Sequence, residues 1–444
     1  MPYPNSPFVE NFNSKLINSL LVEKSENKKT ISNDDLNKIL KWLCSSPKLT
    51  SIRVNTLKAD VEKALQTIKS HFATSQPLKM FVHPCLSNTI LIESEDISKK
   101  TFPKFEKEII VDTECGCAVL RGAHIFAPGV LGMVSGCQVD DNVSIYADIA
   151  KKCKKGLQKV YEGQKLFIGN GRVKMQRHQL FGKNITSSGV AVEIMETISG
   201  CLAISDNVLS LGHGLLQNLP SILCVQALTP LPGDVVLDMC ASPGNKTTHI
   251  AELMKNEGTL IAIDKTPRKV NQLKIRCKDF ESEVFAFQAD STSIVEKENH
   301  LNSRNVTDGP PFLAETFDKV LLDAPCSVLG KRPQLANRMS ENEIKSYVPL
   351  QRKLLEAAVD LLKPGGKMVY STCTITLAEN EGLVAWALRK FPNLKLVKPD
   401  LSLGGRGWTG SSLTDEELNM VQRFGPDDEV DSVGFFFACF LKKI

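Results

Sequence analysis

The sequence predicts an α/β protein whose C-terminal half forms a doubly wound, mostly parallel sheet behind two smaller units. From about residue 235, short apolar runs alternate with helical patterns, as in a parallel sheet covered on both faces. Residues 109–203 contain short β-rich runs between closely spaced turns, which is typical of a small barrel or sandwich. Residues 1–108 mix helix and strand patterns. We therefore divide the chain at 1–108, 109–203 and 204–444.

The first two segments predict an α+β unit followed by a small β domain. Helical patterns cover residues 33–43 and 57–72, and a strand-like run at 49–55 separates them. In the second segment, strand-like runs at 143–147 and 165–168 lie among turns rich in glycine, asparagine and aspartate.

The third segment predicts five parallel strands with helices between them. The expected strands are 235–238, 259–264, 284–290 and the two runs that precede Cys326 and Cys373, with a late antiparallel strand at 433–441. Expected helices end near Met254, begin at Pro267 and cover 350–362 and 377–391, with a polar connection at 296–311 and a turn at 364–366.

Cys326 and Cys373 each follow the C-terminal end of a predicted buried strand. Open α/β sheets bind their ligands at these strand ends. If the two strands are neighbours, about 4.8 Å apart, both thiols face one crevice, which suits nucleophilic chemistry on a pyrimidine ring. The alternative is a pair of ordinary buried thiols, which is common for free cysteine.

Three acids end successive predicted strands. Residues 238–248 combine a strand ending in Asp238, a turn that contains Gly244, and the start of a helix, where free N–H groups accept a polar ligand. Asp264 can bind both hydroxyls of a ribose, and Asp290 can accept from an adenine amino group. The turn matches neither GxGxxG nor a P-loop, so a dinucleotide or P-loop site is not indicated. Three acids on successive strand ends favour S-adenosylmethionine as the cofactor.

Positive charge gathers in residues 151–183, where ten lysines and arginines accompany one acid, Glu162. The segment therefore carries +9 and the remaining chain −5, since the whole chain carries +4. Surfaces normally mix both signs, so we interpret this segment as a phosphate-binding patch. A solvated lysine-rich face is the alternative.

Composition and cysteine usage indicate a reduced, globular enzyme. The 13 cysteines are scattered without zinc-site spacing, so we expect no metal and a cytoplasmic location, with the nucleus left open. Neither a leader pattern nor an apolar stretch long enough to span a bilayer is present in the sequence, so we expect a soluble protein without a membrane partner. We also expect a monomer.

These motifs closely resemble those of the Sun-domain RNA (cytosine-5) methyltransferases. The resemblance rests on residues 238–248, Asp264, Asp290, 323–327 and 371–374, and it implies a Rossmann-like class I methyltransferase domain with a mostly parallel seven-stranded sheet. Upstream, residues 117–130 resemble a PUA domain, and residues 53–56 resemble the RNA-recognition-like segment that precedes the catalytic core in this family. An inserted PUA domain is typical of the subfamily that methylates tRNA near its acceptor end.

The resemblance implies a role for each motif residue. Cys373 would be the nucleophile, Cys326 would assist product release, Asp323 would contact the target cytosine, and Lys246 would support them. The residues that would bind S-adenosylmethionine are Cys240, Ala241, Ser242, Pro243, Gly244, Asn245, Lys246, Asp264, Asp290 and Asp323.

This chemistry needs an activated thiol. C5 of cytosine is too electron-poor to accept a methyl group until a thiolate adds to C6, and a free thiol is only a few per cent ionised at neutral pH. We expect Thr376 to cap a helix that stabilises the Cys373 thiolate. Lys246 would either add positive charge or orient Asp323 or the ligand, and Cys326 or a water would accept the C5 proton.

One residue departs from the family pattern, which has a second glycine where this chain has Asn245. A turn there would need positive φ, which asparagine tolerates, and we expect the cofactor to bind. Two other functions are considered: a catalytically inactive RNA-binding scaffold with a methyltransferase fold, and methylation of an exocyclic amine. The two cysteines argue against the first, and the sequence at 323–326 argues against the second.

By resemblance, the PUA-like domain would bind the acceptor stem and 3′ CCA end of tRNA and leave the catalytic domain over cytosine 72. RNA ends offer splayed bases and phosphates to basic loops, and the target base must be unpaired or flipped. We expect Arg121, Lys154 and Lys155 to contact the RNA, although the lysines could simply keep a barrel edge soluble. Messenger RNA is left open as a second substrate.

Overall fold

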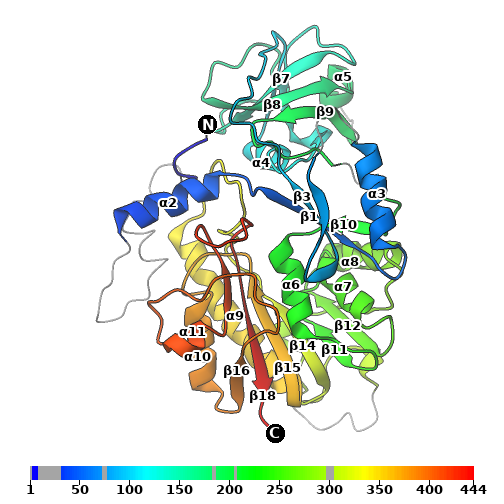
Figure 1. Ribbon diagram of the computed structural model, residues 1–444, viewed down its shortest axis with the longest axis vertical. Helices are drawn as coiled ribbons and strands as arrows, with labels where there is room; N and C mark the ends of the chain where they lie inside the picture. Colours follow the sequence, from blue (N-terminus) through cyan, green and yellow to red (C-terminus); the bar gives the residue numbers. More distant parts are fainter. Residues whose placement is uncertain (1–2, 9–31, 73–77, 183–186, 205–207, 297–304) are drawn as a thin grey trace.

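The computed structural model describes residues 3–8, 32–72, 78–182, 187–204, 208–296 and 305–444, and it arranges them in three connected parts (Figure 1). A six-stranded sheet lies at one end and an eight-stranded sheet at the other, with a four-stranded sheet between them. Of the predicted features, Lys183 and part of the connection at 296–311 lie outside the described residues.

The four-stranded sheet has the order β10-β1-β3-β2 and is covered by α3. Its elements are β1 (Leu49–Val54), α3 (Val61–His71), β2 (Met80–His83), β3 (Leu86–Glu93) and β10 (Gly214–Leu216), preceded by α2 (Asn33–Cys44). The predicted helix at 57–72 begins only at Val61, because the Asp60 carboxylate accepts from Lys63 N and caps it. β10 comes from the segment we divided off at 204, so the first and third segments share a sheet.

The six-stranded sheet forms what we call the β domain, residues 108–197, with the strand order β5-β9-β8-β7-β4-β6. Its elements are β4 (Glu108–Val111), α4 (Thr113–Val119), β5 (Ile125–Phe126), a short 3₁₀ helix η1 (Ala127–Gly129), β6 (Val130–Met133), β7 (Asn142–Asp148), β8 (Lys165–Val173), α5 (Arg177–Phe181) and β9 (Val190–Thr197). The predicted β-rich runs at 143–147 and 165–168 fall in β7 and β8, which pair antiparallel.

The eight-stranded sheet has the order β13-β12-β11-β14-β15-β18-β16, with β17 paired to β18. Its strands are β11 (Val235–Asp238), β12 (Thr259–Asp264), β13 (Phe285–Gln288), β14 (Phe317–Asp323), β15 (Leu362–Thr372), β16 (Leu394–Val397), β17 (Gln422–Phe424) and β18 (Phe435–Lys442). The first five strands in this order are parallel, and β18 is antiparallel to β15 as expected. The expected seven strands become eight because the short β17 adds to β18.

Helices cover both faces of this sheet. They are α6 (Leu219–Leu228), α7 (Asn245–Leu253), α8 (Pro267–Asp279), α9 (Glu341–Leu361), α10 (Glu381–Lys390) and α11 (Asp415–Leu418), with 3₁₀ turns η2 (Ser291–Ser293) and η3 (Val306–Asp308). In β14, Leu321 packs on the α6 side, while its neighbours Val320 and Leu322 pack on the α9 side. This alternation buries both faces, so the doubly wound prediction is confirmed.

Three local predictions differ from the structure. The predicted helix at 350–362 begins at Glu341, because α9 continues through Pro349. The predicted turn at 364–366 lies inside β15, where the register with β14 shifts and Gly365 has φ +77°. The predicted helix at 377–391 begins only at Glu381, after Asn380.

Candidate active site

The carboxyl ends of neighbouring parallel strands bring the predicted site residues to one edge of the sheet. Asp238 ends β11, Asp264 ends β12 and Asp323 ends β14, while Asp290 lies two residues past β13. β14 and β15 pair directly, with Asp323 opposite Ser371, so the loops that carry the two cysteines begin side by side.

The two thiols are in contact. The Sγ atoms of Cys326 and Cys373 lie 3.3 Å apart, and the next residues along each loop, Ser327 and Thr374, join their hydroxyls at 2.6 Å. Cys326 is buried, whereas Cys373 is partly exposed. The prediction that both thiols face one place is therefore confirmed, and the more accessible thiol is the predicted nucleophile.

The surroundings of the pair favour negative charge on Cys373. A hydrogen bond from Cys326 lowers the pKa of the Cys373 thiol, and the positive charge of Lys246 adds to this, against the opposing effects of burial and of Asp323. The pKa of Cys326 rises well above its usual range, because of the hydrogen bond to Cys373, burial and nearby negative charge. These effects favour the thiolate form at Cys373 and the protonated form at Cys326.

The expected source of this activation was wrong. Thr376 does not cap a helix; its hydroxyl donates to the Glu379 carboxylate at 2.8 Å, and α10 begins only at Glu381. The cause is the buried loop between β15 and α10, in which the Thr376 hydroxyl bonds to the acid Glu379. The groups that favour the Cys373 thiolate include Cys326 and Lys246.

Lys246 and Asp323 form an ion pair beside the thiols. Lys246 Nζ lies 2.6 Å from Asp323 Oδ2, and Ser371 Oγ donates to Asp323 Oδ1 at 2.6 Å. Burial is the largest single influence and opposes the charge of Lys246, but the carboxylate of Asp323 and the neighbouring thiols together raise the pKa of the lysine. The Asp323 side chain keeps 31% of its surface exposed, so it can still contact a ligand.

Residues 239–244 form a tight turn between β11 and α7, and Asn245 and Lys246 begin the helix. Gly244 has φ +105°, and a Cβ there would lie 3.1 Å from Leu273 and Arg276 side-chain atoms, so only glycine fits without strain. Asn245 is the first residue of α7 and does not have the positive φ that we expected. The strained position is one residue earlier, where this chain does have glycine.

The strand-tip acids fit a polar ligand. Asp264 accepts from the backbone N–H of Ser242 at 3.1 Å, which ties the turn to the end of β12. Asp290 binds Lys265 at 2.8 Å, and with bonds from Thr292 this lowers its pKa to about 2.

Asp238 has an acceptor atom that no described group satisfies. Its Oδ2 accepts from Thr247, but its buried Oδ1 has no partner among the described residues, and burial raises the pKa of the acid to about 7. An unpaired acceptor next to a glycine turn fits a ligand that carries donors or positive charge. These residues therefore fit S-adenosylmethionine, which would supply an electrophilic methyl group.

Sequence reasoning missed Glu379, which is 1% exposed and whose carboxylate bonds to Ser327, directly after Cys326, and to Thr376, three residues after Cys373. The sequence signal is weak, because an acid in the first turn of a predicted helix is normally solvent-exposed.

Some basic side chains of residues 151–183 are paired within the β domain, and others are exposed on its surface. Lys165 pairs with Glu108, Lys174 with Glu193, and Arg177 donates to backbone carbonyls, so these three stabilise the β domain. Lys154 and Lys155 are exposed on the connection between β7 and β8.

Arg121 lies apart from these lysines, on a cavity between the β domain and the catalytic sheet. The cavity has a volume of about 600 Å³ and is lined by Arg121, His124 and Phe126 on one side and by Asn218 and Asn245 on the other. Arg121 also donates to the backbone carbonyl of Arg332 at 3.3 Å, on the loop that follows Cys326.

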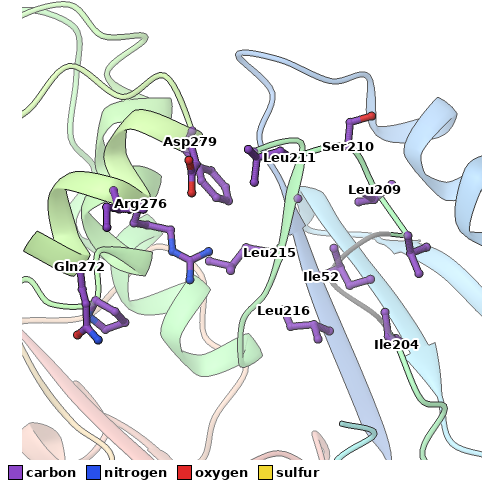
Figure 2. A pocket seen from close by; sticks show the side chains of 16 residues that line it. Ile52, Ile204, Leu209, Ser210, Leu211, Leu215, Leu216, Gln272, Arg276 and Asp279 are labelled. Carbon is purple, nitrogen blue, oxygen red and sulfur yellow. The ribbon is translucent and has the colours of Figure 1, made fainter. Parts of the chain in front are cut away.

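A second cavity, of about 440 Å³, lies between the four-stranded sheet and α8 (Figure 2). Figure 2 shows Arg276 and Asp279 of α8 facing leucines 209, 211, 215 and 216. Pro243 of the cofactor turn also lines it, whereas neither cysteine nor any strand-tip acid does, so this cavity adjoins the turn but not the thiol pair.

In the part of the chain that the structure describes, no three histidine, cysteine or acidic side chains gather as a metal site. None of the described helices is both long and apolar enough to cross a bilayer.

Comparisons with known proteins show the family to which the chain belongs. A family model described as 16S rRNA methyltransferase RsmB/F matches residues 225–441. The tRNA (cytosine(72)-C(5))-methyltransferase NSUN6 of Mus musculus is 41% identical over 432 residues, which cover 91% of this chain and 89% of the mouse protein. The human protein of the same name is 40% identical over 98% of this chain and 97% of its own length.

A solved structure is similar over nearly the whole chain. The crystal structure of NSun6 from Pyrococcus horikoshii with SFG, an S-adenosylmethionine analogue, matches with a TM-score of 0.71 and 30% identity, covering 92% of this chain and 94% of that one. Fold, site and relatives define an S-adenosylmethionine-dependent methyltransferase. The chain belongs to the RsmB/F Sun-domain family of RNA (cytosine-5) methyltransferases, as its motifs predicted.

Proposed function

We propose that this enzyme methylates C5 of cytosine 72 in tRNA through a covalent bond between Cys373 and C6 of the base. The observation that carries the chemistry is the contact of the two thiols, because it makes one sulfur a thiolate beside a carboxylate that can reach the base. The choice of substrate rests on the mouse and human relatives, whose names give cytosine 72 of tRNA as their target and which align with nearly the full chain.

The reaction begins when the Cys373 sulfur adds to C6. Asp323, held by Lys246 and Ser371, would contact the N3 edge of the ring, where in its acid form it would donate the proton that N3 takes up as the sulfur adds. Addition would make C5 nucleophilic, so that it could accept the methyl group that S-adenosylmethionine would supply, with S-adenosylhomocysteine as the leaving group. A base must next remove the C5 proton so that the C6–S bond can break and return the thiolate, and Cys326 or a water would serve.

We propose further that the β domain is a PUA domain and binds the 3′ CCA end. The cavity of about 600 Å³ supports this, because it lies between the β domain and the catalytic sheet. Phe126, 51% exposed, offers a surface on which a base can stack, and Arg121 offers a cation for a phosphate. Lys154 and Lys155 would contact phosphates farther along the stem.

The scaffold alternative loses its only support, because Asn245 occupies an ordinary helical position. Methylation of an exocyclic amine would leave both thiols without a role.

The test is to incubate the protein with total tRNA and isotopically labelled S-adenosylmethionine and to map the methylated nucleotide. We expect 5-methylcytosine at position 72, lost in Cys373→Ala and lost when the CCA end is removed. Product on an amine, or at another tRNA position, would overturn the proposal. Folding of Cys373→Ala is checked by its thermal unfolding.

A further inference from the structure

Glu379 is a buried carboxylate between the two cysteine loops, in the connection from β15 to α10. Four donors converge on it. The backbone N–H of Ser327 and the amide of Gln351 donate to Oε2, each at 2.9 Å. The hydroxyls of Ser327 and Thr376 donate to Oε1 at 2.5 and 2.8 Å. An ionised carboxylate is the form that accepts from all four.

These contacts hold the cysteine loops against each other. Ser327 directly follows Cys326, and its hydroxyl also contacts Thr374, which directly follows Cys373. Gln351 donates to Pro325 O as well, so the residues on both sides of Cys326 are held. The 3.3 Å contact between the thiols lies where these two loops meet.

The two cysteines also differ in the charge of their neighbours. Glu379 bonds directly to the residue after Cys326, whereas the cation Lys246 acts on Cys373. The negative charge of Glu379 is among the causes that raise the pKa of Cys326. The other titratable groups that act on the thiol pair are Asp323, Lys331, Tyr347 and Tyr370.

We propose that Glu379 is a positioning residue that keeps the proton on Cys326, so that Cys373 alone is presented as the thiolate. The inference rests on the proposed covalent mechanism, because it explains why only one of two touching thiols attacks the base. When Cys373 adds to the ring, Cys326 loses its acceptor, and its proton would have to pass to a water before Cys326 could act as a base.

Glu379→Gln removes the charge and fits the same contacts. Both N–H donors meet Oε2, so a glutamine oxygen placed there accepts from them. Both hydroxyls meet Oε1, so a glutamine NH₂ placed there donates to them after they rotate.

The experiment is brief alkylation with iodoacetamide across a series of pH values, with no RNA or cofactor present. A thiolate displaces iodide, so the labelling rate follows the thiolate fraction of each cysteine. Trypsin separates the two sites, because Cys326 lies between Lys319 and Lys331 and Cys373 lies between Lys367 and Arg389. Mass spectrometry then gives the ratio of labelling at the two cysteines.

In the wild type we expect Cys373 to label first. In Glu379→Gln we expect labelling of Cys326 relative to Cys373 to rise about tenfold, the effect of about one pKa unit, with the pH midpoint of the pair moved lower. The matched control is Thr376→Val, which deletes one hydrogen bond but keeps the carboxylate, and it should leave the ratio unchanged.

A ratio in Glu379→Gln within twofold of the wild type would overturn the proposal, as would an equal rise in Thr376→Val. If Glu379→Gln does not fold by circular dichroism, the wild type decides: labelling of Cys326 as fast as Cys373 would contradict the assignment. Because no RNA is used, the outcome is independent of the methylation assay.

Discussion

Asp238 is the buried acid whose replacement most sharply tests the electrostatics of the cofactor site. Burial raises its pKa from 3.8 to about 7, so the folded chain holds this proton more tightly than the unfolded chain. Between about pH 4 and pH 7 the folded state therefore binds more protons, and stability falls as the pH rises. A difference of about three units corresponds to about 4 kcal/mol above pH 7, at about 1.4 kcal/mol per unit.

Asp238→Asn removes this titration while keeping the shape. Its amide oxygen can still accept from Thr247, and its NH₂ takes the place of the unpaired Oδ1, at a cost of about 1 kcal/mol. At pH 5 we expect the variant to match the wild type within about 1 kcal/mol. At pH 8 it should be more stable than the wild type by about 3 kcal/mol.

The assay is urea unfolding at pH 5 to pH 8, followed by tryptophan fluorescence, because Trp386 and Trp408 lie in the catalytic part. Comparison of variant and wild type at each pH cancels the other titrating groups. Parallel pH profiles for the two proteins would refute the reasoning. Cofactor affinity should fall in the variant, because the unpaired carboxylate oxygen is lost.

Three further predictions follow from the packing and charge of named residues. Gly244→Ala should cost about 1–2 kcal/mol, because alanine at φ +105° is strained; calorimetry should also show weaker binding of S-adenosylmethionine. Arg53→Met should destabilise the chain by about 3–5 kcal/mol in urea unfolding, because it leaves the buried Glu252 carboxylate without its ion-pair partner; a loss below about 1 kcal/mol would contradict this. Lys154→Ala with Lys155→Ala should weaken tRNA binding and reduce its dependence on salt, with cofactor binding unchanged in the same preparation.

The sequence predicted correctly those features of the fold and site that depend on a single strand or a single turn. The runs before Cys326 and Cys373 are apolar on both faces, which predicts buried parallel strands, and the pairing of β14 with β15 then brings the thiols together. The strand-tip acids Asp238 and Asp264 follow from the same pattern.

The remaining features depend on contacts that are distant in sequence. Local sequence preference predicts Thr376 as a helix N-cap, but its hydroxyl donates a hydrogen bond to the buried carboxylate of Glu379. β10 has only three residues, and its partner β1 lies about 160 residues earlier, so no periodic signal can reveal it. The turn expected at 364–366 became a bulge because β15 pairs with strands on both sides.

The central claim is that the Cys373 sulfur bonds to C6 of the target cytosine. Its most direct test is to incubate the enzyme and cofactor with tRNA that carries 5-fluorocytosine, whose C5–F bond prevents elimination and so traps the adduct. After nuclease and trypsin digestion, the peptide that contains Cys373 should carry the nucleotide, in the wild type and in Cys326→Ala alike. An adduct on the Cys326 peptide, or none at all with bound cofactor and RNA, would contradict the account.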